Sequence, residues 1–336
     1  MPYHRIRPLL FSPVKFKILQ KLKKEIVVSG EEIAKSVKIS RSGVWKWIRT
    51  LRKEGYVIKG STKKGYFFAG SPDRLFPEEI YKPKMRRFGK NIYFFKKVSS
   101  TMDIAKELAQ KKVPEGTIVI AEKQLSGRGR LGREWVSPPG GIYFSVILYP
   151  KIPLMDVPLI NLMASTVVAE SIKELYGLKP RTKWPNDVLI GEKKVCGILI
   201  ELACEPDRIK WVVLGIGINA NTDRRFINKI ENSTSIKLEL KKKISVVELF
   251  NSVLEKLNRE YRQLNHGRFR KILSKWKNLS STLKKRVKII TPEGEIKGTA
   301  VDVSTRGALL VKLKDNKIKE VYAGDCIHLK KVGRAY

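Results

Sequence analysis

Cysteine and long apolar runs are both scarce in this sequence. Its 336 residues include only three cysteines, Cys196, Cys204 and Cys326, which are scattered and lack the spacing of metal ligands. A disulfide framework and a zinc site are therefore not expected, and reduced thiols are typical of the cytoplasm. No stretch reaches the roughly 18 apolar residues that a membrane span needs, and the N-terminus has no long apolar core or cleavage site. We expect a soluble cytoplasmic protein.

Acidic residues are the other shortage, since 32 Asp and Glu stand against 69 Lys and Arg, for a formal net charge of +37. Such a surface attracts polyanions, so nucleic acid or phosphate ligands are one interpretation. A lysine-rich proteome, such as that of a thermophile, is the other, and the even spread of charge along the chain leaves both open. The 42% hydrophobic content suffices for packed cores, and the length suggests two or three domains.

Residues 1–70 are expected to form a DNA-binding head. Apolar residues recur at helical spacing after position 13, a short helix ends near Val37, and Ser40 is a suitable N-cap for the next helix. Apolar segments at 56–58 and 66–68 flank a basic loop and predict a β-hairpin wing. A basic helix face beside a basic wing tip favours a winged helix-turn-helix over a protein-docking module. The expected DNA contacts are Ser40, Arg41, Ser42, Trp45, Lys46, Arg49, Lys63 and Lys64.

Two further domains are expected after a proline-punctuated linker at residues 71–87. Residues 88–280 mix apolar β-rich runs with helical stretches, without the strict alternation of a doubly wound fold. An α/β domain of the α+β type, with a mixed or antiparallel sheet, is therefore expected. Residues 281–336 contain five short apolar runs separated by turn residues, which predict a small SH3-like β-barrel.

The densest motif is the Arg-Gly loop, residues 127–135, which reads Gly-Arg-Gly-Arg-Leu-Gly-Arg-Glu-Trp. It contains G-x-G-x-x-G, but the Pro-Pro-Gly-Gly that follows cannot form the helix that a dinucleotide-binding turn requires. Glycines let backbone N–H groups approach an anion, and arginines offer forked donors for phosphate and carboxylate. Trp135 adds a flat face on which a base can stack. We therefore interpret the loop as a flexible anion clamp rather than an inert basic loop.

A second cluster reads Lys-Trp-Pro-Asn-Asp at residues 183–187, directly before an apolar strand, and Lys194 follows that strand. A lysine, an amide and a carboxylate at the start of a strand suit a site that handles phosphate and a metal ion. Taken alone, Asp187 could equally cap a turn.

In combination these motifs resemble the biotin protein ligases, and in particular the bifunctional members that also repress the biotin operon. The resemblance covers nearly the whole chain. It rests on Ser100-Thr101, Gln124 with the Arg-Gly loop, residues 183–187, Lys194 with Gly197-Ile198, and residues 215–219. The family usually has Asn where this chain has Met102, so a contact of Met102 with biotin is expected through the backbone.

The resemblance implies a class II synthetase-like catalytic domain that uses ATP and Mg²⁺ to convert biotin to biotinyl-5′-AMP. Biotin then passes to a lysine of the biotin carboxyl carrier protein of a carboxylase, such as acetyl-CoA carboxylase. No protein nucleophile is needed, so catalysis comes from positioning and charge neutralisation.

The resemblance also assigns roles to single residues. The residues expected to bind biotin are Ser100, Thr101, Met102, Gln124, Gly127, Arg128, Gly129, Arg130 and Lys194. Those expected to bind the nucleotide are Arg128, Arg133, Trp135, Asn186, Asp187 and Asn219, with Asp187 as the metal ligand. The expected catalytic cations are Lys194, Arg130 and Lys183.

The partners implied are the carrier protein, operator DNA and a second copy of the chain, in a homodimer that forms with biotinyl-5′-AMP as corepressor. Three alternatives stay open: a ligase without repressor activity, a lipoate-type ligase, and a transcription factor whose catalytic domain only senses a small molecule. The intact Arg-Gly loop and the winged head favour biotin over lipoate. The presence of every charged motif residue argues against a relic domain.

Overall fold

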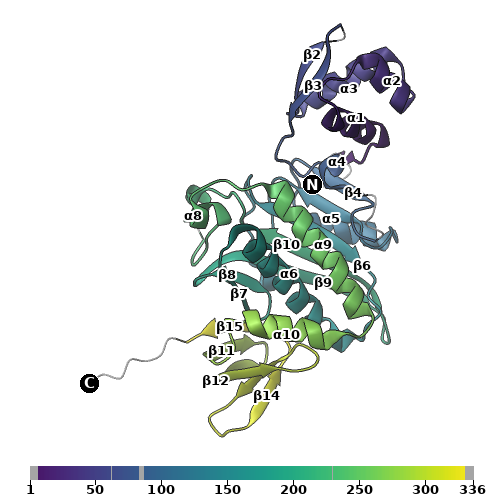
Figure 1. The fold of residues 1–336 in the computed structure, drawn as a ribbon. Coiled ribbons are helices and arrows are strands. Elements are labelled where there is room, and N and C mark those ends of the chain that lie inside the picture. The colour runs from purple at the N-terminus through teal and green to yellow at the C-terminus, as the bar shows by residue number, and fades with distance from the viewer. Residues whose placement is uncertain (1–6, 62, 83–86, 229, 330–336) are drawn as a thin grey trace.

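The computed structural model describes residues 7–61, 63–82, 87–228 and 230–329. Figure 1 shows three bodies in a row: a small helical head, a central domain with a large sheet, and a β-rich C-terminal domain. The predicted fold class is confirmed, since a helix-turn-helix head precedes a mixed α/β domain and an antiparallel sheet follows it.

The head begins each of its helices at a serine. Ser12, Ser29 and Ser40 each accept a hydrogen bond from the backbone N–H three residues further on, which satisfies amide groups that the helix leaves unpaired. The side chains of Val44, Ile48 and Leu51 are buried, and the basic face of the third helix stays exposed. The elements are α1 (Pro13–Lys24), α2 (Gly30–Val37), α3 (Arg41–Lys53), β2 (Val57–Ser61) and β3 (Gly65–Gly70).

The head is inserted between two strands of the central sheet. β1 (Leu9–Leu10) pairs antiparallel with β4 (Ile92–Phe95), with Leu9 opposite Phe94. The first described residues therefore belong to the central sheet, although residues 1–70 were expected to form the head as a whole. A strand of two residues carries no periodic pattern, so its partner could not be read from the sequence.

The expected linker is structured where it is described, and it packs against the head. It contains α4 (Pro77–Ile80), whose Glu78 side chain is only 1% exposed. Glu78 lies 3.0 Å from Lys15 Nζ and accepts a hydrogen bond from Ser12 N at 3.0 Å. Lys15 Nζ also pairs with Glu54 at 2.6 Å. The head is therefore joined to α4 by an ionic network in which the side chains of Lys15 and Glu78 are buried.

The central domain contains an eight-stranded sheet with the order β1-β4-β5-β6-β10-β9-β8-β7. Among the described strands, β4 and β5 are parallel and all other neighbours are antiparallel, as expected for a mixed sheet. The remaining strands are β5 (Ile118–Ala121), β6 (Ile142–Leu148), β7 (Pro180–Lys183), β8 (Asp187–Ile190), β9 (Lys193–Cys204) and β10 (Ile209–Ile218).

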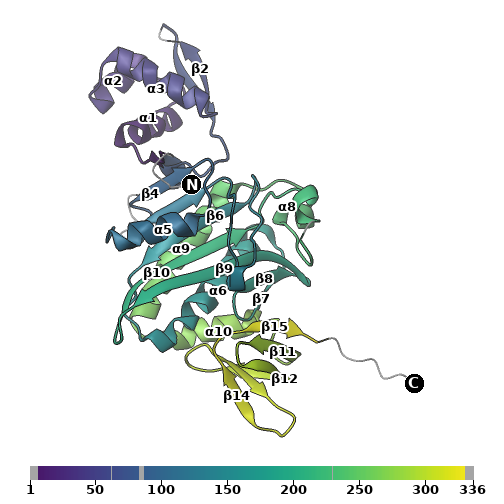
Figure 2. The ribbon, with the colours of Figure 1, turned by 180° about the vertical axis from the view of Figure 1, so that it is seen from behind.

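Helices cover both faces of this sheet. One face carries α6 (Pro158–Tyr176), α9 (Val246–Asn265) and α10 (Phe269–Leu279), and Figure 2 shows α5 (Thr101–Gln110) on the other. Each face has its own apolar core. The segment 154–176 is long and apolar enough to cross a membrane, but 78% of its apolar 18-residue window is buried in the interior, which identifies α6 as a core helix. Short helical turns are η2 (Arg130–Gly132), η3 (Leu154–Asp156), α7 (Arg224–Ile227) and α8 (Ile236–Leu240).

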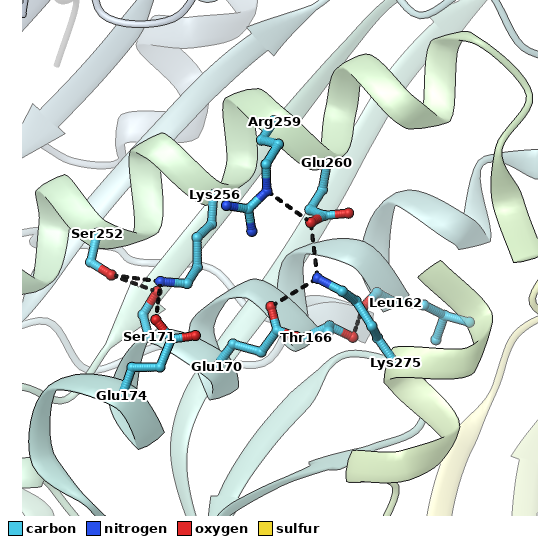
Figure 3. A network of polar contacts seen from close by, with 10 residues as sticks. All are labelled: Leu162, Thr166, Glu170, Ser171, Glu174, Ser252, Lys256, Arg259, Glu260 and Lys275. Atoms are coloured by element: carbon cyan, nitrogen blue, oxygen red, sulfur yellow. Dashed lines mark hydrogen bonds and ion pairs between the residues drawn. The ribbon is translucent and has the colours of Figure 1, made fainter. Parts of the chain in front are cut away.

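Ion pairs fasten the three helices behind the sheet to one another (Figure 3). Lys275 Nζ on α10 lies 2.9 Å from Glu260 Oε1 on α9 and 3.2 Å from Glu170 Oε2 on α6. Lys256 on α9 pairs with Glu174 on α6 at 2.8 Å. Because the Glu260 carboxylate is 6% exposed, it requires the charge of Lys275 as a partner. The network fixes α10, which leads directly into the C-terminal domain.

The C-terminal domain is one antiparallel sheet with the order β14-β13-β12-β11-β15. Each of the five short runs that the sequence predicts as strands forms a strand in the structure. They are β11 (Arg286–Thr291), β12 (Gly294–Val303), β13 (Leu309–Lys312), β14 (Ile318–Val321) and β15 (Asp325–His328). In both ribbon views β15 and β11 lie on the side that faces the central domain.

Candidate active site

A cavity of about 420 Å³ lies where the central domain meets the C-terminal sheet. Its walls come from the start of α5, the Arg-Gly loop, the β7–β8 turn, the first half of β9, the end of β10, the segment 230–233, and β11 and β15. Most residues expected in the site meet here: Ser100, Thr101, Met102, Gln124, Arg128, Gly129, Arg130, Arg133, Trp135, Lys183, Asn186, Asp187 and Lys194.

Two residues of the expected set do not line this cavity. Gly127 is buried against the returning chain, where an added Cβ would lie under 3.0 Å from Trp135 O and Ser137 Oγ. Asn219 is 1% exposed and donates from Nδ2 to Thr234 O at 3.0 Å. Asn219 therefore supports the segment that carries residues 230–233 rather than facing the cavity.

One end of the cavity is a hydrogen-bonding end built around the start of α5. Gln124 Oε1 accepts from Thr101 N at 2.8 Å and from Thr101 Oγ1 at 3.1 Å, while its Nε2 donates to Ser137 Oγ at 2.9 Å. Ser100 Oγ caps α5 by accepting from Met102 N. The Met102 side chain, 4% exposed, occupies the space above Gly215, which has no Cβ to displace it.

Trp135 forms part of the floor of the cavity, over two adjacent strands. An added Cβ on Gly217 would lie under 3.0 Å from the Trp135 ring, and the same holds for Gly197 on the neighbouring strand. The two glycines are paired in the β9–β10 register, so they provide one flat depression. Lys194 Nζ lies 5.2 Å from the centre of the indole ring, at cation–π distance.

The Arg-Gly loop folds back on itself, and its three arginines reach three different parts of the molecule. Gly129 N donates to Arg133 O at 2.7 Å across the loop. Arg128 pairs with Asp103 at 2.7 Å and Glu201 at 3.1 Å on the central domain. Arg130 Nη1 donates to Asn186 Oδ1 at 3.4 Å and to Gly324 O at 3.2 Å, and burial lowers its pKa below the ordinary value. Arg133 pairs with Asp325 of the C-terminal sheet.

The other end of the cavity is cationic and is built on the β7–β8 turn. Asp187 Oδ1 lies 2.6 Å from Lys194 Nζ, so the two motif residues meet although seven positions separate them. Asn186 Nδ2 donates to Ile198 O at 2.6 Å, and Ile198 N donates to Asn186 O at 3.0 Å. With Lys183 and Arg130 also in the wall, this end suits the binding of phosphate groups.

The described residues contain no group of three or more His, Cys, Asp or Glu side chains arranged to hold a metal ion. A single carboxylate is nevertheless enough for Mg²⁺ when substrate phosphates supply further oxygen ligands. Asp187, at the cationic end of the cavity, is compatible with such a role.

Sequence reasoning missed the wall that the C-terminal domain contributes. Ile290, Asp325, Cys326 and Ile327 line the cavity, as do residues 230–233. None of them stands in a motif, and each reaches the cavity through contacts far away in the chain. The pairing of Asp325 with an arginine almost two hundred positions earlier has no local signal.

The head presents the predicted DNA contacts on its surface. Trp45 is 47% exposed on α3, and the Arg49 guanidinium lies 5.6 Å from the centre of its ring. The remaining predicted contacts are also exposed, namely Ser40, Arg41, Ser42, Lys46, Lys63 and Lys64. A basic surface on α3 and at the wing tip fits a duplex backbone.

Comparison with known protein families places three regions of the chain. Residues 94–219 match the Biotin/lipoate A/B protein ligase family, residues 282–329 match the Biotin protein ligase C terminal domain, and residues 14–67 match an HTH domain. Fold and site thus define a protein ligase of the biotin/lipoate class that carries a DNA-binding head.

Single relatives narrow this class. The chain is 36% identical over 303 residues to the bifunctional ligase/repressor BirA of Bacillus subtilis, which covers 89% of this chain and 93% of the relative. It is 29% identical over 303 residues to the BirA of Escherichia coli, over 88% and 91% of the two chains. The chain belongs to the biotin protein ligase family, with the domain composition of its bifunctional ligase/repressor members. Among solved structures, biotin protein ligase from Aquifex aeolicus in complex with biotin and ATP matches with a TM-score of 0.62 and 32% identity, over 71% of this chain and 98% of that one.

Proposed function

We propose that this chain joins biotin to ATP in the cavity, forms biotinyl-5′-AMP, and transfers biotin to a lysine of a biotin carboxyl carrier protein. The observation that carries the proposal is the division of one cavity into a hydrogen-bonding end and a cationic end, with Trp135 between them. The first suits the ureido group of biotin, and the second suits phosphates. The Aquifex aeolicus relative, solved with biotin and ATP, supports the same use.

In the first step, a carboxylate oxygen of biotin attacks the α-phosphorus of ATP, and pyrophosphate leaves. Both reactants are anions, so a fixed cation between them lowers the barrier. Lys194 is the residue we assign to this place, because its ammonium group lies beside both Trp135 and Asp187. In the second step, the carrier lysine attacks the carbonyl carbon of the mixed anhydride, and AMP leaves.

The remaining cavity residues hold the reactants in line. Ser100, Thr101 and Gln124 would bind the ureido group, and the backbone of the Arg-Gly loop would close over the carboxylate. Arg128, Arg130, Arg133 and Lys183 would neutralise phosphate oxygens, and Trp135 would stack near the adenine. Asn186 and Asp187 would bind Mg²⁺ together with the phosphates, and the bound ion would neutralise further phosphate charge.

The test of the ligase proposal is an incubation with labelled ATP and biotin, with lipoate in a parallel reaction, followed by addition of a carrier domain. We expect formation of biotinyl-5′-AMP, release of pyrophosphate and biotin on the carrier lysine. Arg130→Ala should release more free biotinyl-5′-AMP, because the loop that covers it loses two anchors. Activation of lipoate in preference to biotin would refute the proposal.

The repressor function that the bifunctional relatives carry is proposed for the head. A single head makes few contacts, so a specific complex needs two heads on a two-fold site. β9 offers a place for such a dimer: its pairing with β8 ends at Gly197, and from Ile198 to Cys204 the described strands pair with it only through β10. Two copies joined along this edge would continue the sheet. The protein would act in the cytoplasm.

The test of the repressor proposal is a gel shift on DNA upstream of biotin genes, at physiological salt and against unrelated competitor DNA. Binding should strengthen with biotinyl-5′-AMP and weaken steeply with salt, as phosphate contacts require. The competitor is essential, because a chain with a net charge of +37 binds any DNA at low salt. Binding that is indifferent to both sequence and biotinyl-5′-AMP would leave only the ligase.

A further inference from the structure

The chain passes from the central domain to the C-terminal domain beside β7, the strand that leads to the cationic end of the cavity. Residues 280–282 connect α10 to the C-terminal sheet and run beside the end of β7. Ser281 N donates to Thr182 O at 2.7 Å, and Ser280 and Thr182 form a parallel bridge. One residue further, Thr282 Oγ1 accepts a hydrogen bond from Trp184 N at 3.0 Å. The connection is therefore bonded to the β7–β8 turn from outside the cavity.

The Thr282 hydroxyl joins this turn to the last strand of the chain. Thr282 is fully buried, and its Oγ1 lies 3.1 Å from His328 Nε2 on β15. A backbone N–H can only donate, so the Thr282 hydroxyl accepts a hydrogen bond from Trp184. Toward His328 Nε2 the same hydroxyl donates or accepts, according to the tautomer of the ring. Burial, together with the positive charges of Lys183 and Lys285, lowers the pKa of His328 to about 4. The ring is therefore neutral at neutral pH, with one nitrogen that donates and one that accepts a hydrogen bond.

The side chain of Trp184 is anchored to the same domain. It is 1% exposed, and its Nε1 donates to Gly307 O at 3.3 Å. Backbone and indole of Trp184 are thus both held by the C-terminal part of the chain. Lys183 directly precedes Trp184 and Asn186 follows it by two positions, so a shift of Trp184 would move both residues in the cavity wall.

We propose that Thr282 and His328 are positioning residues for the adenylation reaction, which hold the β7–β8 turn at the phosphate end of the cavity through the backbone of Trp184. The inference rests on the proposed function, since it assigns the β7–β8 turn to ATP. The biotin end is built separately, from Ser100, Thr101 and Gln124, whose hydrogen bonds involve neither of the two residues. Loss of the link should therefore affect ATP and spare biotin.

Thr282→Val tests this link, because valine keeps the shape of threonine and removes the hydroxyl. We expect kcat/KM for ATP to fall by about ten-fold or more, since small misplacements of catalytic groups have large effects on rate. The dissociation constant for biotin should stay within about two-fold of the wild type. Thr282→Ser keeps the hydroxyl and should have the kcat/KM for ATP of the wild type. Ser281→Ala is the matched control, because Thr182 O still accepts from Ser281 N.

A second measurement does not depend on activity. Hydrogen exchange at the Trp184 amide should be slow in the wild type and in Thr282→Ser, and faster in Thr282→Val. His328→Phe removes the hydrogen-bonding partner of the Thr282 hydroxyl on β15 and should also lower ATP use, by a smaller factor. It provides a second variant if Thr282→Val does not fold.

Two kinetic results would overturn the inference: unchanged ATP kinetics in a folded Thr282→Val, or equal losses for biotin and ATP, which indicate a general packing role. A Trp184 amide that exchanges equally fast in the wild type and in Thr282→Val would overturn it as well. If the wild type makes no biotinyl-5′-AMP, the proposed function fails instead, and the amide exchange still decides whether the link exists.

Discussion

Replacement of Lys194 by alanine separates catalysis from stability. Lys194 Nζ lies 2.6 Å from Asp187 Oδ1 and 5.2 Å from the centre of the Trp135 ring, so its charge is fixed inside the cavity. Loss of one preorganised group that stabilises charge in the transition state costs about 10²–10³ in rate, or roughly 3–4 kcal/mol. We expect a loss of this size in the formation of biotinyl-5′-AMP.

The same substitution should have little effect on folding. The two side chains of the Lys194–Asp187 pair are 30% and 20% exposed, and ion pairs that solvent reaches contribute about 0.2–1 kcal/mol. For domains of this size, 1 kcal/mol shifts Tm by about 2–4 °C. Lys194→Ala should therefore be folded, nearly as stable as the wild type, and almost inactive.

The assay is single-turnover conversion of labelled ATP and biotin to biotinyl-5′-AMP, with calorimetric biotin titration and thermal unfolding on the same sample. Lys193→Ala is the matched control, because Lys193 is the preceding lysine on the same strand and its side chain is exposed. An adenylation rate within about five-fold of the wild type would refute the assignment of Lys194. An equal loss in Lys193→Ala would show that the rate depends only on general positive charge.

Three further predictions concern other parts of the molecule. Gly217→Ala should displace the Trp135 ring and weaken ATP binding. Gly70→Ala is the control, because a Cβ there meets nothing within 4 Å. Unchanged Trp135 fluorescence and ATP affinity in Gly217→Ala would contradict the contact of Trp135 with Gly217. Lys15→Met should destabilise the head by about 3 kcal/mol, because the buried carboxylate of Glu78 and the mostly buried carboxylate of Glu54 lose their partner. Hydrogen exchange of α1 measures this, and unchanged protection would count against the network. The pKa of His328 falls from its ordinary 6.5 to about 4 in the folded chain, so the unfolded chain binds the proton first as pH falls. Stability present above pH 6.5 should therefore decrease toward about pH 4, and His328→Gln should flatten this dependence in denaturant titrations. An equally steep dependence in His328→Gln would exclude His328 as its source.

Local patterns in the sequence were sufficient for most elements of the fold. Ser40 caps α3 as predicted, because an N-cap depends on a side chain and a backbone amide only three positions apart. The strand Ile142–Leu148 is buried throughout, and an apolar run interrupted only by Ser145 is enough to indicate such a strand. The Arg-Gly loop and residues 183–187 identified the family because each motif carries its chemistry within a few positions.

The sequence by itself thus determined the order of the domains, the type of most elements and the residues that carry charge to the site. The tertiary structure decided which distant segments complete it. The wall from Asp325 to Ile327, the link from Thr282 to His328 and the pairing of β1 with β4 join parts of the chain that no periodicity relates. The glycines of β9 and β10 show the same limit: Gly197 and Gly217 lack a side chain because Trp135 lies against them, a steric reason that exists only after the loop has folded over the sheet.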